Sequence, residues 1–92
     1  MNTMRINNSI VRLDAIYDIS CVKYKEGTVV RVEYPRSIKE YLVPGFFKPE
    51  VVAAAIHQGM NDEGNSFDLM AKLQALDRIY GGVRVDETKN ES

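Results

Sequence analysis

The sequence has one cysteine, one histidine and no tryptophan among its 92 residues. The single cysteine, Cys21, excludes an intramolecular disulfide and every cysteine-based zinc pattern within one chain, which favours a reducing compartment. The longest unbroken apolar run, residues 51–56, is far shorter than the roughly 20 residues that cross a bilayer. The first residues contain no basic segment that leads into an apolar one, so no signal peptide is expected. We therefore expect a cytoplasmic protein without a membrane partner.

The sequence also lacks the motifs of common catalytic and metal sites. No glycine-rich loop opens a helix after a strand, as phosphate-binding loops do. The segment 61–65, Asn-Asp-Glu-Gly-Asn, offers oxygen ligands without the acidic spacing of an EF-hand loop. His57 has no cysteine or aspartate at ligand spacing, and a nucleophilic pair with Cys21 would need a contact that the sequence does not indicate. We predict no enzyme activity, no catalytic residue, no cofactor and no metal.

The residues that are present describe an ordinary small globular chain. Hydrophobic residues make up 45 % and charged residues 27 %, with five tyrosines and three phenylalanines. We expect a single domain over residues 1–92, with flexible tails at 1–8 and 86–92. The net charge of −1 is unevenly divided: residues 1–48 hold eight Lys or Arg against five Asp or Glu, and 49–92 hold four against eight. Halves of about +3 and −4 favour self-association or a charged partner.

Three strands are predicted in the first half of the chain. Residues 16–24 are rich in isoleucine, tyrosine, valine and cysteine, and residues 28–34 alternate between apolar and polar side chains. Lys25-Glu26-Gly27 between them suits a three-residue hairpin turn that ends in glycine. Residues 38–43 form the third predicted strand.

The turn length sets which side chains share a face. A three-residue turn places Tyr24 opposite Thr28. Val22 then faces Val30 on a mostly apolar face, while Arg31 and other charged side chains lie on the opposite face.

The register of the third strand stays open. Setting Tyr34 opposite Ile38 pairs Glu33 with Lys39, but it also brings a glutamate beside a valine. A short helical turn through 37–42 is the alternative.

Residues 42–49, Leu-Val-Pro-Gly-Phe-Phe-Lys-Pro, separate the predicted strands from the predicted helices. Two prolines and a glycine interrupt regular structure, and two adjacent phenylalanines bring a large apolar area. We predict that Pro44, Phe46 and Phe47 form the structural junction between the two halves.

Two helices are predicted after this junction. The first begins at Pro49, which suits the first helical position, and ends between residues 58 and 60. The second covers 67–80, with Asn65 or Ser66 as its N-cap and two glycines at its end. The fold class is therefore α+β: a three-stranded antiparallel β-meander packed against a C-terminal helix pair, with room for extra short edge strands.

Basic residues of the predicted sheet are interleaved with tyrosine. Such a face can stack bases on aromatic rings while the cations meet phosphate, although a charged sheet face is often only a solvated surface. The helix pair has the small-residue spacing of a helix-turn-helix, but its second helix offers only two cations to DNA phosphates. The candidate binding face therefore consists of Lys23, Arg31, Arg36, Lys39 and Tyr41.

Residues 19–67 carry a recognisable order of features. They comprise a strand ending in Tyr24, an alternating strand with Val30, Val32 and Tyr34, a strand with Tyr41 that ends in Val43-Pro44, a helix over 52–56, and Gly64 followed by Phe67. This order resembles the small KTSC-type domain over roughly half of the chain. The resemblance implies a small binding domain, and some relatives in phage anti-defence proteins sequester cyclic nucleotide signals as oligomers. It assigns no site residue.

These observations together predict a small non-enzymatic binding or regulatory protein that acts through protein–protein interaction, such as a phage-type accessory or inhibitor protein. The first alternative is a nucleotide- or RNA-binding domain that uses the basic and aromatic sheet face. A DNA-binding helix-turn-helix regulator ranks third. The expected partner is a protein, which includes a second copy of this chain in a homo-oligomer, and a nucleotide or RNA is the alternative ligand.

Overall fold

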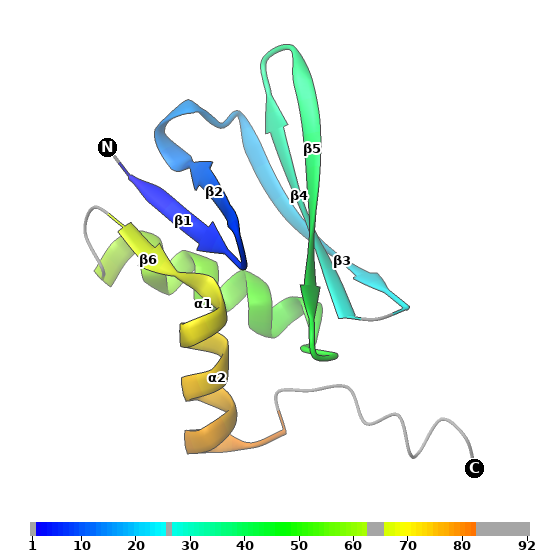
Figure 1. Cartoon of the computed structure of the whole chain (residues 1–92), viewed down its shortest axis with the longest axis vertical. Helices are drawn as coiled ribbons and strands as arrows, with labels where there is room; N and C mark the ends of the chain where they lie inside the picture. Colours follow the sequence, from blue (N-terminus) through cyan, green and yellow to red (C-terminus); the bar gives the residue numbers. More distant parts are fainter. Residues whose placement is uncertain (1, 26, 63–65, 83–92) are drawn as a thin grey trace.

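The strands form two separate sheets, and one helix lies across both (Figure 1). The structure is a computed structural model that describes residues 2–25, 27–62 and 66–82, so the predicted tail at 86–92 lies outside the described residues. The described elements, in chain order, are β1 (Thr3–Ile6), β2 (Ser9–Arg12), a short 3-10 helix (Leu13–Ala15), β3 (Asp18–Tyr24), β4 (Gly27–Tyr34), β5 (Ser37–Pro44), α1 (Pro49–Asp62), β6 (Ser66–Asp68) and α2 (Leu69–Tyr80).

The strands β3, β4 and β5 form the predicted antiparallel meander, which confirms the α+β fold class. Along β4 the side chains alternate as the sequence predicts: Val30 and Val32 are fully buried, whereas Arg31 is exposed. The third predicted strand is a strand, which excludes the helical turn considered for this segment. Below, the face that carries Val30, Val32 and Val43 is the inner face of this sheet, and the opposite face is the outer face.

The register between β3 and β4 differs by one residue from the predicted one. Tyr24 pairs with Gly27, and Val22 pairs with Val29 instead of Val30. The predicted three-residue turn is wrong because Gly27 belongs to the strand, which leaves a two-residue connection of a common hairpin length. Since side chains alternate between faces, this shift places Val22 and Tyr24 on the outer face.

Gly27 fixes this register. Its φ is +152°, a conformation that residues with a Cβ rarely adopt, and a Cβ at this position would meet the backbone carbonyl oxygen of Val43 on β5. A glycine is therefore required where β4 begins, because a larger residue would not allow β5 to pass so close.

The register between β4 and β5 is also shifted by one residue. Tyr34 pairs with Ser37, and Lys39 pairs with Val32 on the inner face. Glu33 lies on the outer face, so the predicted pairing of Glu33 with Lys39 is wrong.

The segment 1–8, predicted as a flexible tail, contains β1 and the turn into β2, so that prediction is wrong. β1 pairs antiparallel with β2 and parallel with β6, which gives a sheet of its own in the order β2-β1-β6. Met4 and Ile6 are 0 % and 2 % exposed, so this strand contributes to the core. Asn7 and Asn8 make the turn between the strands, and Asn7 adopts a positive φ of 53° that asparagine tolerates well.

The first helix begins at its predicted residue, and the second begins later than predicted. α1 starts at Pro49 as predicted and continues slightly beyond its predicted end. α2 starts two residues later than predicted, and the Asp68 carboxylate caps it by accepting a hydrogen bond from the Ala71 amide at 3.2 Å. Ser66 is not the cap because it pairs with β1 as part of β6, and Asn65 lies outside the described residues.

The junction between strands and helices spans residues 45–48. Pro44 ends β5 and is exposed, and Phe46 is half-buried with a φ of +60°. Phe47 is fully buried, and its carbonyl oxygen accepts a hydrogen bond from the buried Thr28 hydroxyl at 2.7 Å. Phe47 therefore anchors the junction to β4.

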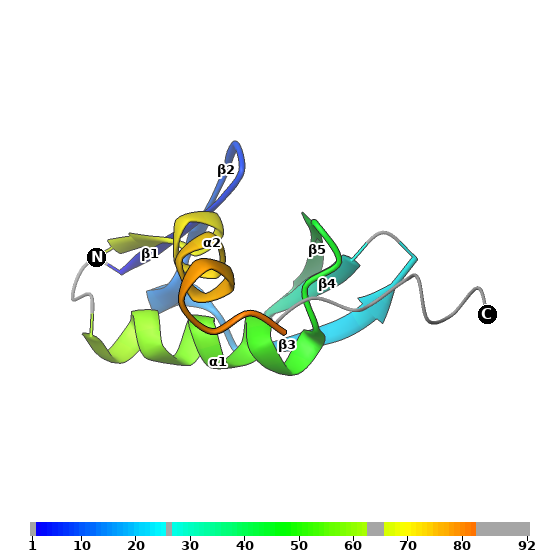
Figure 2. The ribbon, with the colours of Figure 1, turned by 90° about the horizontal axis from the view of Figure 1, so that it is seen from below.

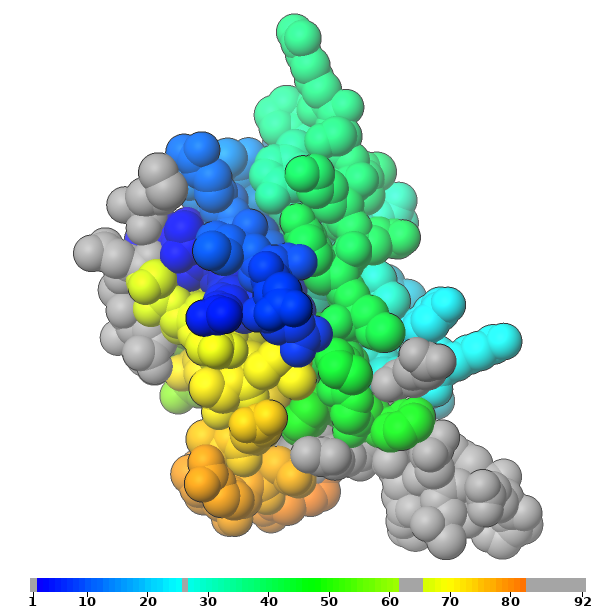
Figure 3. All heavy atoms as spheres, viewed as in Figure 1, coloured from blue at the N-terminus to red at the C-terminus, as the bar shows by residue number. Residues whose placement is uncertain are grey.

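α1 lies across the two sheets and holds them together (Figure 2). It packs on β3 and β4 of the meander and on β6 of the other sheet, while α2 packs on α1 and β1. Gly59 allows the close approach of β6, since a Cβ there would lie 2.5 Å from the Phe67 ring. Buried side chains of both sheets and both helices form one hydrophobic cluster. The far end of the β4–β5 hairpin extends beyond this core (Figures 1 and 3).

Candidate binding surfaces

The five residues of the predicted binding face do not lie on one surface. Lys23, Lys39 and Tyr41 are on the inner face, Arg31 is on the outer face, and Arg36 is in the turn between β4 and β5. The shift in register causes this separation. Relative to the predicted sheet, the side chains of β3 and β5 lie on the opposite face, whereas those of β4 lie on the predicted face. The structure brings together only Lys39 and Tyr41.

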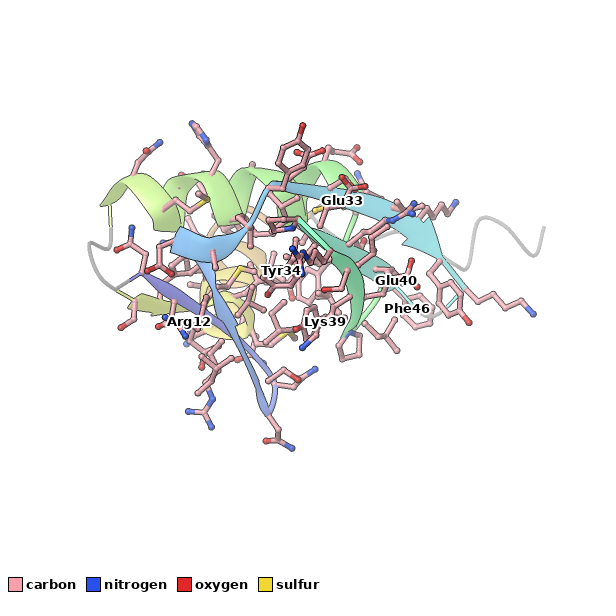
Figure 4. All side chains as sticks on the ribbon, turned by 90° about the horizontal axis from the view of Figure 1, so that it is seen from above. Arg12, Glu33, Tyr34, Lys39, Glu40 and Phe46 are labelled. Atoms are coloured by element: carbon pink, nitrogen blue, oxygen red, sulfur yellow. The ribbon has the colours of Figure 1, made fainter. Side chains whose placement is uncertain are left out.

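Lys39 and Tyr41 lie beside two residues that the sequence did not single out, Tyr34 and Arg12. The four form what we call the basic-aromatic cluster. The Lys39 Nζ is 6.0 Å from the centroid of the Tyr34 ring, at the outer limit of a cation–π contact. In Figure 4, Tyr34 and Lys39 lie on the side of the β4–β5 hairpin that faces Arg12 of β2. The cluster therefore draws on both sheets.

The side chains of this cluster shift the pKa of Tyr34. Burial raises the pKa of the Tyr34 phenol above its usual value, and the neighbouring Tyr41 side chain raises it further. The positive charges of Lys39 and Arg12 lower this pKa against those effects. Tyr34 is thus a neutral hydroxyl at physiological pH, close to two cations.

Within the described part of the chain, neither cation of the cluster is neutralised by a carboxylate. Among residues 2–25, 27–62 and 66–82, Lys39 and Arg12 take part in no ion pair. Glu33 and Glu40 belong to the same hairpin, but the register turns both to the outer face, and Figure 4 shows them on the far side from Arg12. The cluster is therefore locally positive on a chain whose net charge is −1.

Two members of the cluster were missed for different reasons. Tyr34 follows Val30 and Val32 at a spacing of two, so the alternation of β4 alone could have placed it on the inner face. Arg12 ends a strand of the other sheet, and its approach to Tyr34 depends on how the two sheets meet, for which the sequence has no local signal.

The outer face carries an exposed apolar patch. Val22, Val29 and Leu42 are paired in register across the three strands, and Tyr24 follows Val22 on the same face. Val22 is 51 %, Tyr24 53 % and Leu42 38 % exposed. We call Val22, Tyr24, Val29 and Leu42 the outer apolar patch. The predicted register would have buried Val22 and Tyr24, so the patch is a consequence of the observed register.

Charged side chains of both signs border this patch. In the next row of the sheet, Arg31 pairs in register with Ser20 on one side and Glu40 on the other. An apolar centre with a polar border is the usual composition of a protein–protein interface.

Cys21 and His57 line one hollow of about 290 Å³ between β3 and α1, together with Ile19, Ile56 and Met60. Burial raises the pKa of the Cys21 thiol from 9.0 to about 11, so almost no thiolate is present at neutral pH. The exposed His57 ring lies 3.1 Å from the Asn61 side-chain nitrogen, at hydrogen-bond distance. A protonated, half-buried thiol is a poor nucleophile, and this arrangement gives no support to nucleophilic catalysis.

A larger hollow of about 710 Å³ lies at the far end of the β4–β5 hairpin. Tyr17, Tyr34 and Arg36 line it with the outer-face residues Glu33 and Ile38, among others. The Tyr17 amide donates a hydrogen bond to the Glu33 carbonyl oxygen at 2.6 Å and holds the start of β3 against β4. The hollow is open and wraps around the sheet from one face to the other, so it defines no single ligand.

In the part of the chain that the structure describes, no helix is long and apolar enough to cross a membrane. The described residues also contain no group of three or more His, Cys, Asp or Glu side chains placed to hold a metal ion. No family model, curated protein or solved structure matches this chain at a significant level. The resemblance to KTSC-type domains therefore stays a prediction.

Proposed function

We propose that this chain is a small non-enzymatic binding protein that docks on a protein partner through the outer apolar patch. The observation that carries the proposal is the row of Val22, Val29 and Leu42 across three strands, with Tyr24 beside it. Val22, Leu42 and Tyr24 are exposed, and Val29 between them is half-buried. Single exposed apolar residues are common on protein surfaces, but adjoining ones on a rigid sheet mark interaction sites.

The chemistry of the patch suits a protein partner. Tyrosine is enriched among the residues that dominate binding energy, and its ring offers a large contact area at a low entropic cost. Arg31 and Glu40 on the border can pair with charges on a partner and set its orientation. β5 is also an edge strand of its sheet, so a partner can reach the patch beside an open backbone edge.

The identity of the partner is narrowed by the charge of the chain. The two halves of the chain carry opposite charges of about +3 and −4. These charges favour either a second copy of this chain or another charged protein as the partner. A role as a phage-type accessory or inhibitor protein rests only on the resemblance within residues 19–67. The single cysteine supports a cytoplasmic location.

The test compares charge insertions in the patch with one elsewhere. The variants Leu42→Glu and Val22→Glu place a carboxylate in the patch, and Ile79→Glu places one on α2, where Ile79 is 70 % exposed. Affinity capture from a lysate of the source cells, with a photo-cross-linking residue at position 24, identifies the partner. Sedimentation at high concentration tests self-association.

We expect the two patch variants to lose the captured protein or the self-association by about tenfold or more, since each buries a charge in the interface. Ile79→Glu should retain it. Retention by both patch variants, or a strict monomer that captures no partner, would contradict the proposal.

A further inference from the structure

The basic-aromatic cluster on the inner face is not used by the proposed docking surface, and its residue types are those of a ligand site. Lys39 lies beside Tyr34 and Tyr41, and Arg12 of the other sheet is close enough to Tyr34 to lower its pKa (Figure 4). Within the described residues no carboxylate pairs with either cation. Two unpaired cations on either side of one tyrosine make this surface locally positive, which favours the binding of an anion.

We propose that this cluster binds a nucleotide unit, with the phosphate held by Lys39 and Arg12 and the base stacked on a tyrosine ring. The proposal concerns the inner face and does not depend on the outer apolar patch. A nucleotide unit occurs free in solution or within a single-stranded nucleic acid, and both sources share this chemistry.

The phosphate part of the proposal rests on the two cations. Lys39 is an exposed ammonium, and Arg12 an exposed guanidinium from the end of β2. A guanidinium binds phosphate through two parallel hydrogen bonds, and an ammonium adds a mobile point charge. The neutral Tyr34 hydroxyl beside them can donate a further hydrogen bond to a phosphate oxygen.

The base part of the proposal rests on the two tyrosines. Tyr34 and Tyr41 are half-buried, so part of each side chain is accessible to a ligand. Lys39 lies over the Tyr34 ring, where an approaching phosphate would draw the ammonium aside and free a ring face. Stacking on an aromatic ring tolerates every base, so we expect little sequence preference.

Arg36 extends the cluster toward the far end of the hairpin. It lies in the exposed turn that projects from the core (Figure 3), on the same strand pair as Lys39. A strand longer than one nucleotide could therefore follow the hairpin from the cluster toward Arg36, which a free nucleotide would not reach.

The experiment uses the full chain and two ligands. A fluorescein-labelled single-stranded RNA of about 12 nucleotides, within the usual site sizes, is titrated by anisotropy at low and high salt. Adenosine monophosphate and inorganic phosphate are titrated by calorimetry under the same low-salt conditions. Circular dichroism confirms that each variant is folded.

The variants are matched by position. Lys39→Gln and Arg12→Gln each remove one charge from the cluster, and Tyr41→Leu removes one ring. Arg31→Gln is the control, because it removes a charge from the same sheet but on the outer face. We expect about tenfold weaker binding for each cluster charge variant, about fivefold or more for Tyr41→Leu, and no change for Arg31→Gln.

Salt-sensitive binding of RNA with this variant pattern supports the proposal for a strand, and binding of the mononucleotide alone with the same pattern supports it for a free nucleotide. Inorganic phosphate that binds as tightly as either ligand overturns the stacking of the base. Absence of binding at micromolar protein, or an equal loss for Arg31→Gln, overturns the proposal.

Discussion

The inner and outer faces of the β3–β4–β5 sheet are both rich in valine, yet only the inner face is covered by the rest of the described chain. Val30, Val32 and Val43 on the inner face are fully buried, whereas Val22 on the outer face is half exposed. The two faces alternate along the same strands, so the register alone decides which valines join the core. A pattern of apolar residues thus identifies a strand without identifying its buried side.

The largest effect is expected where the register itself is fixed. Gly27→Ala places a Cβ against the Val43 carbonyl oxygen at a φ of +152°, so we expect a loss of at least about 3 kcal/mol in the free energy of unfolding. Gly82→Ala is the control, because its φ is also positive at 65° but no atom lies within 4 Å, and about 1 kcal/mol is expected. Urea denaturation measures both. Equal losses would show that Gly27 does not pin the strands.

Replacing one valine on each face by alanine tests directly which face is buried. Val30→Ala leaves a cavity in the core and should lower the free energy of unfolding by about 2 kcal/mol. Val22→Ala removes the same atoms from the exposed outer face and should cost about 0.5 kcal/mol or less. Thermal and urea unfolding of the two variants provide the measurement. A larger loss for Val22→Ala would reverse the assignment of the faces.

A polar residue of the inner face should show a smaller effect. Thr28→Val keeps the shape of the buried side chain but removes the hydroxyl that donates to the Phe47 carbonyl oxygen. We expect a loss of about 1 kcal/mol in the free energy of unfolding, since that oxygen is then left without its donor. Ser20→Ala, on the exposed outer face, should be close to neutral. A neutral Thr28→Val would show that this bond does not anchor the junction.

The smallest effect appears only at alkaline pH. The pKa of Cys21 is 9.0 when unfolded and about 11 in the folded chain, because burial disfavours the thiolate. The stability that this shift represents is fully present below pH 9 and is lost as the pH rises toward 11. Tyr34, whose pKa is also raised, acts in the same direction, so the difference between the native chain and Cys21→Ala isolates the thiol. A constant difference from pH 8 to pH 11 would contradict the burial of Cys21.

Elements with strong local signals were predictable from the sequence. The alternation over 28–34 identifies β4, and Pro49 marks the start of α1. The register was not predictable, because two-residue and three-residue turns leave the same strand pattern. The choice depends on the close approach of Gly27 to Val43 on the neighbouring strand.

The second sheet was not predictable either, because it depends on pairing between residues far apart in the sequence. β6 is only three residues long, Ser66–Asp68, and it becomes a strand by pairing in parallel with β1 at the other end of the sequence. From the sequence alone, its residues resemble the start of α2, which is why the local pattern predicts Asn65 or Ser66 as the N-cap. The basic-aromatic cluster was not predictable for both reasons. Lys39 lies on the inner face only in the observed register, and Arg12 belongs to the second sheet, which the sequence did not predict.

Cross-strand nuclear Overhauser effects test the central claim most directly, because they report which residues are paired in solution. The structure predicts contacts that join Val22 to Val29 and Val29 to Leu42, in one row on the outer face. A contact that instead joins Val22 to Val30 would establish the register expected from the three-residue turn, and one that joins Val30 to Leu42 would establish the register with Tyr34 opposite Ile38. The first result would bury Val22 and remove the basis for the proposed docking surface.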